Sequence, residues 1–251
     1  MLKKLLTSAL FAGFGAGLLV ALLQIFIAVP VILEAELYES GIEVHYAGVV
    51  QPVEPDHNDG HDAEAHANEA ARDAGDPVEA EAPPEGFDWS RNIQTFLATE
   101  MNYIGYAFLL IAGIAFAARS GTITTARSGI IWGVAGFVAF SLSPAMGLPP
   151  ELPGAMAAPL PLRQTWWIGT VVATIAALVA FGFGKNWLHW GLGIVLLALP
   201  HIIGFPKAGG YGGVVPPELA GEFVGITLAI SAIGWATLGL LAGYFWAKEE
   251  T

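Results

Sequence analysis

The chain has 251 residues and a net charge of −12, with 55% hydrophobic but only 13% charged residues. A soluble domain carries about 25% charged residues, so the composition excludes an ordinary soluble globular protein. The absence of cysteine excludes disulfides, thiolate metal sites and thiol redox chemistry. Several apolar segments reach the ~20 residues that a bilayer requires, which predicts an all-α, polytopic membrane helix bundle surrounded by lipid.

Six apolar segments are predicted to cross the membrane, at about residues 5–31, 93–118, 128–146, 165–184, 187–204 and 222–246. The first follows Lys3 and Lys4 and is far longer than the ~7–15-residue core of a signal peptide, so we interpret it as an uncleaved span. The fourth and fifth are separated by Gly184-Lys185-Asn186 and are expected to form a hairpin. Glycines four residues apart, as at Gly129 and Gly133, favour close helix packing.

The chain divides into a first span at residues 1–33, an acidic loop at 34–92, and five further spans with Pro/Gly-rich loops at 93–251. Basic residues indicate the orientation. One side of the bundle has six in short connections, namely Lys3, Lys4, Arg119, Arg127, Lys185 and Lys248. The other has four in longer loops, namely Arg72, Arg91, Arg163 and Lys207. The positive-inside rule then predicts cytoplasmic termini and an acidic loop on the outer side.

The acidic loop contains sixteen of the 22 acidic residues, between Glu34 and Asp88. Its part from about Glu39 to Pro84 has few large apolar residues, so it is predicted to be largely disordered. Three histidines, His57, His61 and His66, lie there among carboxylates. Imidazole and carboxylate groups suit divalent Co, Ni or Zn, which predicts a weak, flexible collecting site. The alternative is a merely solvating acidic linker.

Carboxylates and one imidazole also gather in the outer half of the predicted spans, where charge is costly and usually functional. Glu100 is the deepest carboxylate, and Thr95, Thr99 and Asn102 accompany it. The remaining candidate ligands near the span ends are Glu34, Glu36, Glu151, His201 and Glu222. The alternative for Glu34, Glu36 and Glu222 is that each merely caps a helix.

The stretch Ser141–Gly154 has four prolines, and we expect it to form a stiff, non-helical turn that presents Glu151. A Pro-Pro-Glu motif occurs three times, at residues 83–85, 149–151 and 216–218. The motif is typical of helix starts, since proline suits the first helical position and glutamate the first turn. The alternative is a repeated two-helix unit that presents carboxylates on one face.

Enzymatic and nucleic-acid functions find no support in the sequence. Gly182-Phe-Gly-Lys185 lacks the first glycine and the Ser/Thr of a phosphate-binding loop, and there is no HExxH or nucleophile-elbow motif. There is no basic patch of the kind that binds nucleic acid. We therefore predict a non-enzymatic protein that requires no cofactor and binds no nucleic acid.

The chain resembles the CbtA family, proposed cobalt transporter subunits of bacterial membranes. The resemblance rests on Pro30–Glu39, the histidine-bearing loop after it, Trp89 and Arg91, Ser143–Gly154, the run Arg163-Gln-Thr-Trp-Trp167, and Pro200-His201 with Pro206. It implies a bacterial inner-membrane protein that acts with a small single-span partner, CbtB, which has a histidine-rich terminus. The family is usually described with five spans, against the six predicted above.

Together these features predict a membrane subunit for uptake of a divalent transition metal, with the loop histidines and outer carboxylates as collecting and entry ligands. The resemblance implies cobalt, whereas ligand type alone leaves nickel and zinc open. The alternative is a non-transporting membrane scaffold or assembly factor whose acidic loop binds a partner protein.

Overall fold

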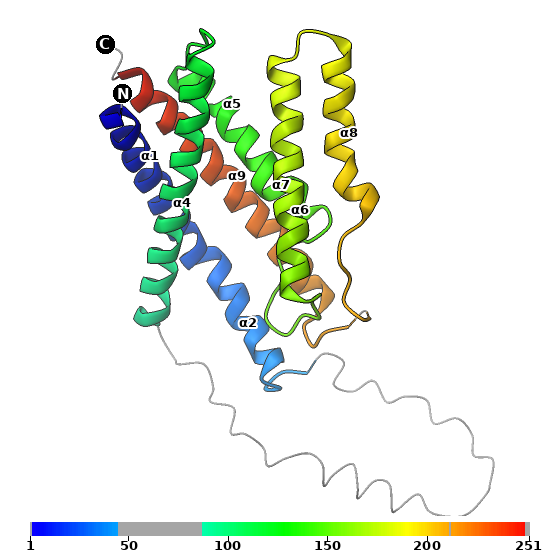
Figure 1. Cartoon of the computed structure of the whole chain (residues 1–251). Coiled ribbons are helices and arrows are strands. Elements are labelled where there is room, and N and C mark those ends of the chain that lie inside the picture. The colour runs from blue at the N-terminus through cyan, green and yellow to red at the C-terminus, as the bar shows by residue number, and fades with distance from the viewer. Residues whose placement is uncertain (1, 45–86, 211, 249–251) are drawn as a thin grey trace, which may run out of the picture.

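A computed structural model describes residues 2–44, 87–210 and 212–248, and these residues form an all-helical bundle (Figure 1). Its elements are α1 (Leu2–Leu23), η1 (Gln24–Ala28), α2 (Val29–Glu39), α4 (Trp89–Ala118), α5 (Ala126–Phe137), η2 (Val138–Leu142), α6 (Ser143–Ala145), α7 (Leu160–Phe183), α8 (Trp187–Ile203) and α9 (Pro217–Lys248). Here η marks a short π-helix. Within the described residues there is one isolated β-bridge, between Ala155 and Gly213, and no strand. The all-α prediction is confirmed.

Five helical segments are long and apolar enough to cross a membrane, and they span Leu2–Glu39, Trp89–Ala118, Ala126–Ala145, Leu160–Phe183 and Pro217–Lys248. The fifth of the six predicted segments forms α8, an apolar helix of only 17 residues. At a rise of 1.5 Å per residue, α8 is about 25 Å long, less than the ~30 Å hydrocarbon core. The bundle therefore has five candidate spans and one shorter apolar helix, which pairs with α7 in the predicted hairpin.

The helices alternate in direction, so the bundle has two distinct ends (Figure 1). The terminal end carries the start of α1, the end of α9 and the short connections α4–α5 and α7–α8. The loop end carries the ends of α2 and α8, the starts of α4, α7 and α9, and the loops at 146–159 and 204–216. These two loops touch through the bridge between Ala155 and Gly213.

Local sequence accounts for several helix starts. Asp88 caps α4 by accepting a hydrogen bond from the backbone N–H of Arg91 at 3.0 Å. Thr125 and Ser128 form a reciprocal capping box at α5, and Asn186 caps α8. Such caps satisfy backbone N–H groups that have no partner within the helix.

Glycine allows the closest helix contacts, as the sequence predicts. On α5, a Cβ added to Gly129 or Gly133 would collide with the backbone of α9, at Gly239 and at Trp235 respectively. On α1, a Cβ added to Gly13 would lie 2.6 Å from the Cα of Ile104 in α4. Close backbone approach of this kind lets helices associate in lipid, where the hydrophobic effect does not drive them together.

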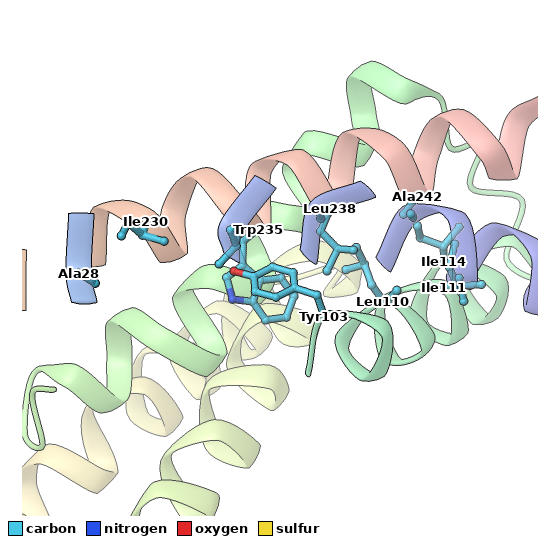
Figure 2. Close-up of a cluster of buried hydrophobic side chains, with 14 of the residues drawn as sticks. Ala28, Tyr103, Leu110, Ile111, Ile114, Ile230, Trp235, Leu238 and Ala242 are labelled. Carbon is cyan, nitrogen blue, oxygen red and sulfur yellow. The ribbon is translucent and has the colours of Figure 1, made fainter. Parts of the chain in front are cut away.

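The core follows the contact of α1, α4 and α9 (Figure 2), and it extends from Ala9 and Trp246 near the terminal end to Ala35 and Leu219 near the loop end. Ile230, Trp235, Leu238 and Ala242 follow α9 on the side that faces α1 and α4, and all four are buried. Leu110, Ile111 and Ile114 of α4 pack against this row. Apolar side chains therefore join α1, α4 and α9 along much of their length.

Two predicted boundaries are wrong. The helix that begins at Ala126 continues to Ala145, through Ser143 and Pro144, so Ser141–Gly154 is not wholly a turn. A π-helical segment precedes Pro144, and such wider turns accommodate residues that would break a regular helix. Likewise, the first helix runs to Glu39 and α4 begins at Trp89, so both ends of the loop assigned to 34–92 are helical.

Candidate functional site

Glu36 forms an ion pair with an arginine. It lies on α2 and receives two hydrogen bonds from the guanidinium of Arg91 at the start of α4, at 2.8 and 2.9 Å. This two-point geometry makes a strong, directional ion pair. Asp88 lies 3.9 Å from the same arginine. The pair joins α2 to α4 at the loop end, and it neutralises a carboxylate that the sequence suggested as a metal ligand.

Glu151 is also paired with an arginine. It lies in the loop after α6, and its carboxylate is 2.5 Å from a guanidinium nitrogen of Arg163 on α7. Both side chains are about a quarter exposed, at 26% and 28%. The pair therefore remains accessible from the loop end.

Glu100 is the one carboxylate among the buried side chains of the described residues, with 6% of its surface exposed. Neither of its carboxyl oxygens has a hydrogen-bond partner in the described part of the chain. The carboxyl group lies against Gly17 of α1, where an added Cβ would be 2.6 Å from Oε2. A glycine at position 17 is thus required for this side chain to fit between α1 and α4.

His201 lies near the end of α8 and belongs to a short chain of polar groups. Its Nε2 is 3.4 Å from the hydroxyl of Ser143, which in turn accepts a hydrogen bond from Thr174 at 3.0 Å. Trp166 packs edge-on against the His201 ring and donates to the carbonyl of Pro200 at 3.3 Å. These contacts hold α8 against α6 and α7.

The predicted metal ligands do not form one centre in the described residues. No group of three or more His, Asp or Glu there could hold a metal ion. Glu34 and Glu222 are exposed on their helices. The loop histidines His57, His61 and His66 lie outside the described residues, as does most of the predicted disordered segment.

The two described Pro-Pro-Glu motifs differ in structure. Glu218 lies in the first turn of α9, as expected of a helix start. Glu151 instead lies in an irregular loop, nine residues before α7 begins at Leu160. The motif at 83–85 lies outside the described residues. The differing geometries rule against a repeated two-helix unit at these two positions.

A polar cleft of about 360 Å³ occupies the loop-end half of the bundle. Its hydroxyl and amide groups come from η1, α4, η2 and α9, namely Gln24, Thr95, Thr99, Asn102, Ser141, Thr227 and Ser231. Thr99 and Thr227 each lie ten residues from the loop-end start of their helices, so the cleft is about 15 Å deep in the bundle. Tyr103, Tyr106 and Trp235 also line it.

These aromatic side chains form a cluster with Phe140. The ring of Tyr106 lies 4.8 Å from that of Trp235, and Phe140 is 5.4 Å from both of these rings. Tyr103 adds an edge-on contact with Tyr106 at 5.9 Å. Trp235 also belongs to the apolar core, so the cluster connects the cleft to that core.

A second, larger cavity of about 740 Å³ opens beside the cleft at the loop end. Glu151 and Arg163 line it. Ser141, Thr227 and Ser231 line both cavities, and the hydroxyls of Ser141 and Ser231 are hydrogen-bonded at 2.7 Å. This hydroxyl pair therefore lies between the paired carboxylate of the outer cavity and the deeper cleft.

Both π-helices contribute to the cleft. Gln24 is the first residue of η1 and accepts a hydrogen bond from Thr99 at 2.5 Å, and Ser141 belongs to η2. π-Helical turns inside α-helices are frequent at functional sites. Sequence reasoning missed Gln24, Ser141, Thr227 and Ser231. Their signal was a set of polar residues inside apolar spans, with Thr227 and Ser231 four residues apart on one helix face.

The five candidate spans indicate a multi-pass membrane protein, with two adjoining cavities in its loop-end half. A family model described as "Probable cobalt transporter subunit (CbtA)" matches residues 2–247, nearly the whole chain. The chain belongs to this family, as its sequence motifs indicated. No curated protein and no solved structure matches it.

Proposed function

We propose that the chain is the membrane-embedded subunit for uptake of a divalent transition metal, with cobalt as the foremost substrate. The ion enters from the loop end, which we assign to the outer face of a bacterial inner membrane. It passes the Glu151–Arg163 cavity and then reaches the polar cleft. The single observation that carries this proposal is the pair of adjoining cavities in a chain of the cobalt transporter subunit family.

Polarity along the bundle supports this direction. The two cavities share lining residues and lie in the loop-end half. A cavity of about 380 Å³ at the terminal end, between the start of α1 and the end of α9, shares no lining residue with them, and core side chains such as Leu238 lie between it and the cleft. A pathway closed on one side fits a transporter that exposes its substrate site to one face at a time. Net uptake would then require movement of the core side chains that separate the cleft from the terminal end.

Uptake of radiolabelled Co²⁺ into cells that express the chain tests the proposal. We expect Glu151→Gln to lower uptake at limiting Co²⁺, with Glu218→Gln as the control at the same end of the bundle. His201 lines neither cavity, so His201→Ala tests separately whether this sequence-predicted ligand contributes to uptake. Glu218 is exposed in the first turn of α9 and lines neither cavity. Uptake that is unchanged in both test variants would remove these residues from the pathway.

A partner subunit is part of the proposal. The family description names a subunit, and we propose a small single-span, CbtB-like protein as the partner. Helix α8 offers a surface for it, because only Gly193 and Pro200 of α8 are buried within the described structure. Large apolar side chains such as Ile194, Ile202 and Trp187 are exposed there.

The same exposed surface also favours the alternative function, a membrane scaffold. Deletion of residues 50–80 distinguishes the two functions by cobalt-dependent growth. A collecting loop should matter only when cobalt is scarce, since abundant metal does not need to be concentrated. A loop that binds a partner protein should matter at low and high cobalt alike.

A further inference from the structure

We infer that the polar cleft binds the transported cation with its water shell intact, through hydroxyl and amide groups rather than through direct ligation. This inference rests on the proposed transport function and names the form in which the substrate is bound. The site consists of Gln24, Thr99, Asn102, Ser141, Thr227 and Ser231, none of which is among the metal ligands expected from the sequence.

The chemistry of the lining carries the inference. A bare divalent cation in the membrane needs several anionic or imidazole ligands, because removing a charge from water is costly. No such set of three exists in the described residues, and the accessible carboxylates of Glu36 and Glu151 already neutralise arginines. The carboxyl of Glu100 faces Gly17 of α1 and is not part of the cleft lining. The polar groups that line the cleft are all neutral hydrogen-bonding groups, which suit water ligands, and aliphatic and aromatic side chains line the rest of it.

The size of the cleft agrees with a hydrated ion. A shell of about six waters occupies roughly 180 Å³, because each water takes about 30 Å³ of liquid volume. The cleft volume is about 360 Å³ and the outer cavity is larger, so a hydrated ion fits in both. Water-mediated hydrogen bonds are nearly as favourable as direct ones, so such a site can hold the ion without stripping it.

One lining residue has unused hydrogen-bonding capacity. The hydroxyl of Thr227 is buried and has no hydrogen-bond partner among the described residues. Buried polar groups nearly always have a partner, so an unpaired hydroxyl beside a polar cleft points to a hydrogen-bonding ligand. Thr227 lines both cavities, which places this hydroxyl where an ion would move from one to the other.

Hexaamminecobalt(III) provides the probe. Its ammonia ligands do not exchange, so it resembles a hydrated cation in size and hydrogen bonding but cannot be bound directly by side chains. The natural chain has no cysteine, so one introduced thiol is its sole labelling site. We therefore place Asn102→Cys in the cleft of the full-length protein and label it with a cationic, water-soluble thiol reagent. Met101→Cys is the matched control, because Met101 is the adjacent residue, is 75% exposed and does not line the cleft.

We expect the reagent to label Asn102→Cys and hexaamminecobalt(III) to slow that labelling, while Met101→Cys reacts slowly and without protection because it faces lipid. Adding Thr227→Val to Asn102→Cys should weaken protection about threefold to tenfold, the usual effect of one lost hydrogen bond. Absence of labelling at Asn102→Cys, or labelling that the complex does not slow, would overturn the inference.

Measurement of Co²⁺ uptake distinguishes failure of the hydrated-ion site from failure of the proposed transport function. If Co²⁺ uptake is present and hexaamminecobalt(III) inhibits it competitively, both hold. If uptake is present but the complex neither inhibits it nor protects the thiol, the hydrated site fails and the proposed function stands. If the thiol is protected but the wild-type chain takes up no Co²⁺, the proposed function fails while the cleft still binds cations of this kind.

Discussion

The two halves of the bundle differ in what fills the space between the helices. In the terminal-end half, glycines bring α5 against α9 and α1 against α4, and apolar side chains such as Ile111 and Leu238 pack between α1, α4 and α9. A cavity lined by Thr7, Ser8 and Lys248 lies beyond them. In the loop-end half, π-helices replace regular turns, and the helices enclose two adjoining cavities. The cleft therefore adjoins a second cavity at the loop end, whereas core side chains separate it from the cavity at the terminal end.

The largest expected effect comes from disrupting the close contact between α5 and α9. Gly133→Leu would place a side chain against the backbone of Trp235 and force α5 from α9. Overpacking of this kind costs typically 1–3 kcal/mol and more where backbone must move. We expect a large drop in the melting temperature of the purified protein. The control is Gly105→Leu, because an added Cβ at Gly105 meets nothing within 4 Å. Equal stability of the two variants would contradict the close packing.

A smaller effect is expected at the outer cavity. Arg163→Gln should leave the carboxylate of Glu151 unpaired and raise Co²⁺ uptake at limiting metal, whereas Glu151→Gln should lower it by leaving an unpaired cation. The pair is partly exposed, so each substitution should change the interaction with the ion by at most about 1 kcal/mol, which corresponds to roughly fivefold in uptake at limiting Co²⁺. Initial uptake rates measure it. Changes of the same sign in the two variants would show that the charge of this cavity does not steer the ion.

The smallest effect concerns the tie between α2 and α4. Glu36→Gln should lower the free energy of unfolding by about 1 kcal/mol, because it breaks the two-point pair with Arg91 at a partly exposed site. Glu34→Gln, two residues earlier on an exposed position, is the control and should be neutral. Chemical denaturation of the purified protein measures both. A loss of stability in the control equal to that in Glu36→Gln would argue against the pair.

Hydropathy predicted the helices well, because membrane-length apolar runs leave few other structures available. The positions of individual side chains were harder to predict. Sequence alone grouped Glu36, Glu100, Glu151 and His201 by depth, but it does not encode which helix neighbours which. Each of the four contacts a different helix. Glu36 pairs with Arg91 of α4, and Glu100 lies against Gly17 of α1. Glu151 pairs with Arg163 of α7, and His201 lies beside Ser143 of α6. The π-helices were also missed, since nothing in the periodicity of the spans marks a single widened turn.

The most direct test of the account is initial uptake of radiolabelled Co²⁺ by cells that carry the Asn102→Leu/Thr227→Val double variant. The matched control is Met101→Leu/Thr170→Val, which changes a lipid-facing side chain and a buried hydroxyl bonded to its own helix, both outside the cleft. With membrane levels of the two proteins equal, we predict that the double variant loses most uptake while the control retains the wild-type rate. Wild-type uptake in the double variant would contradict passage of the metal through the cleft.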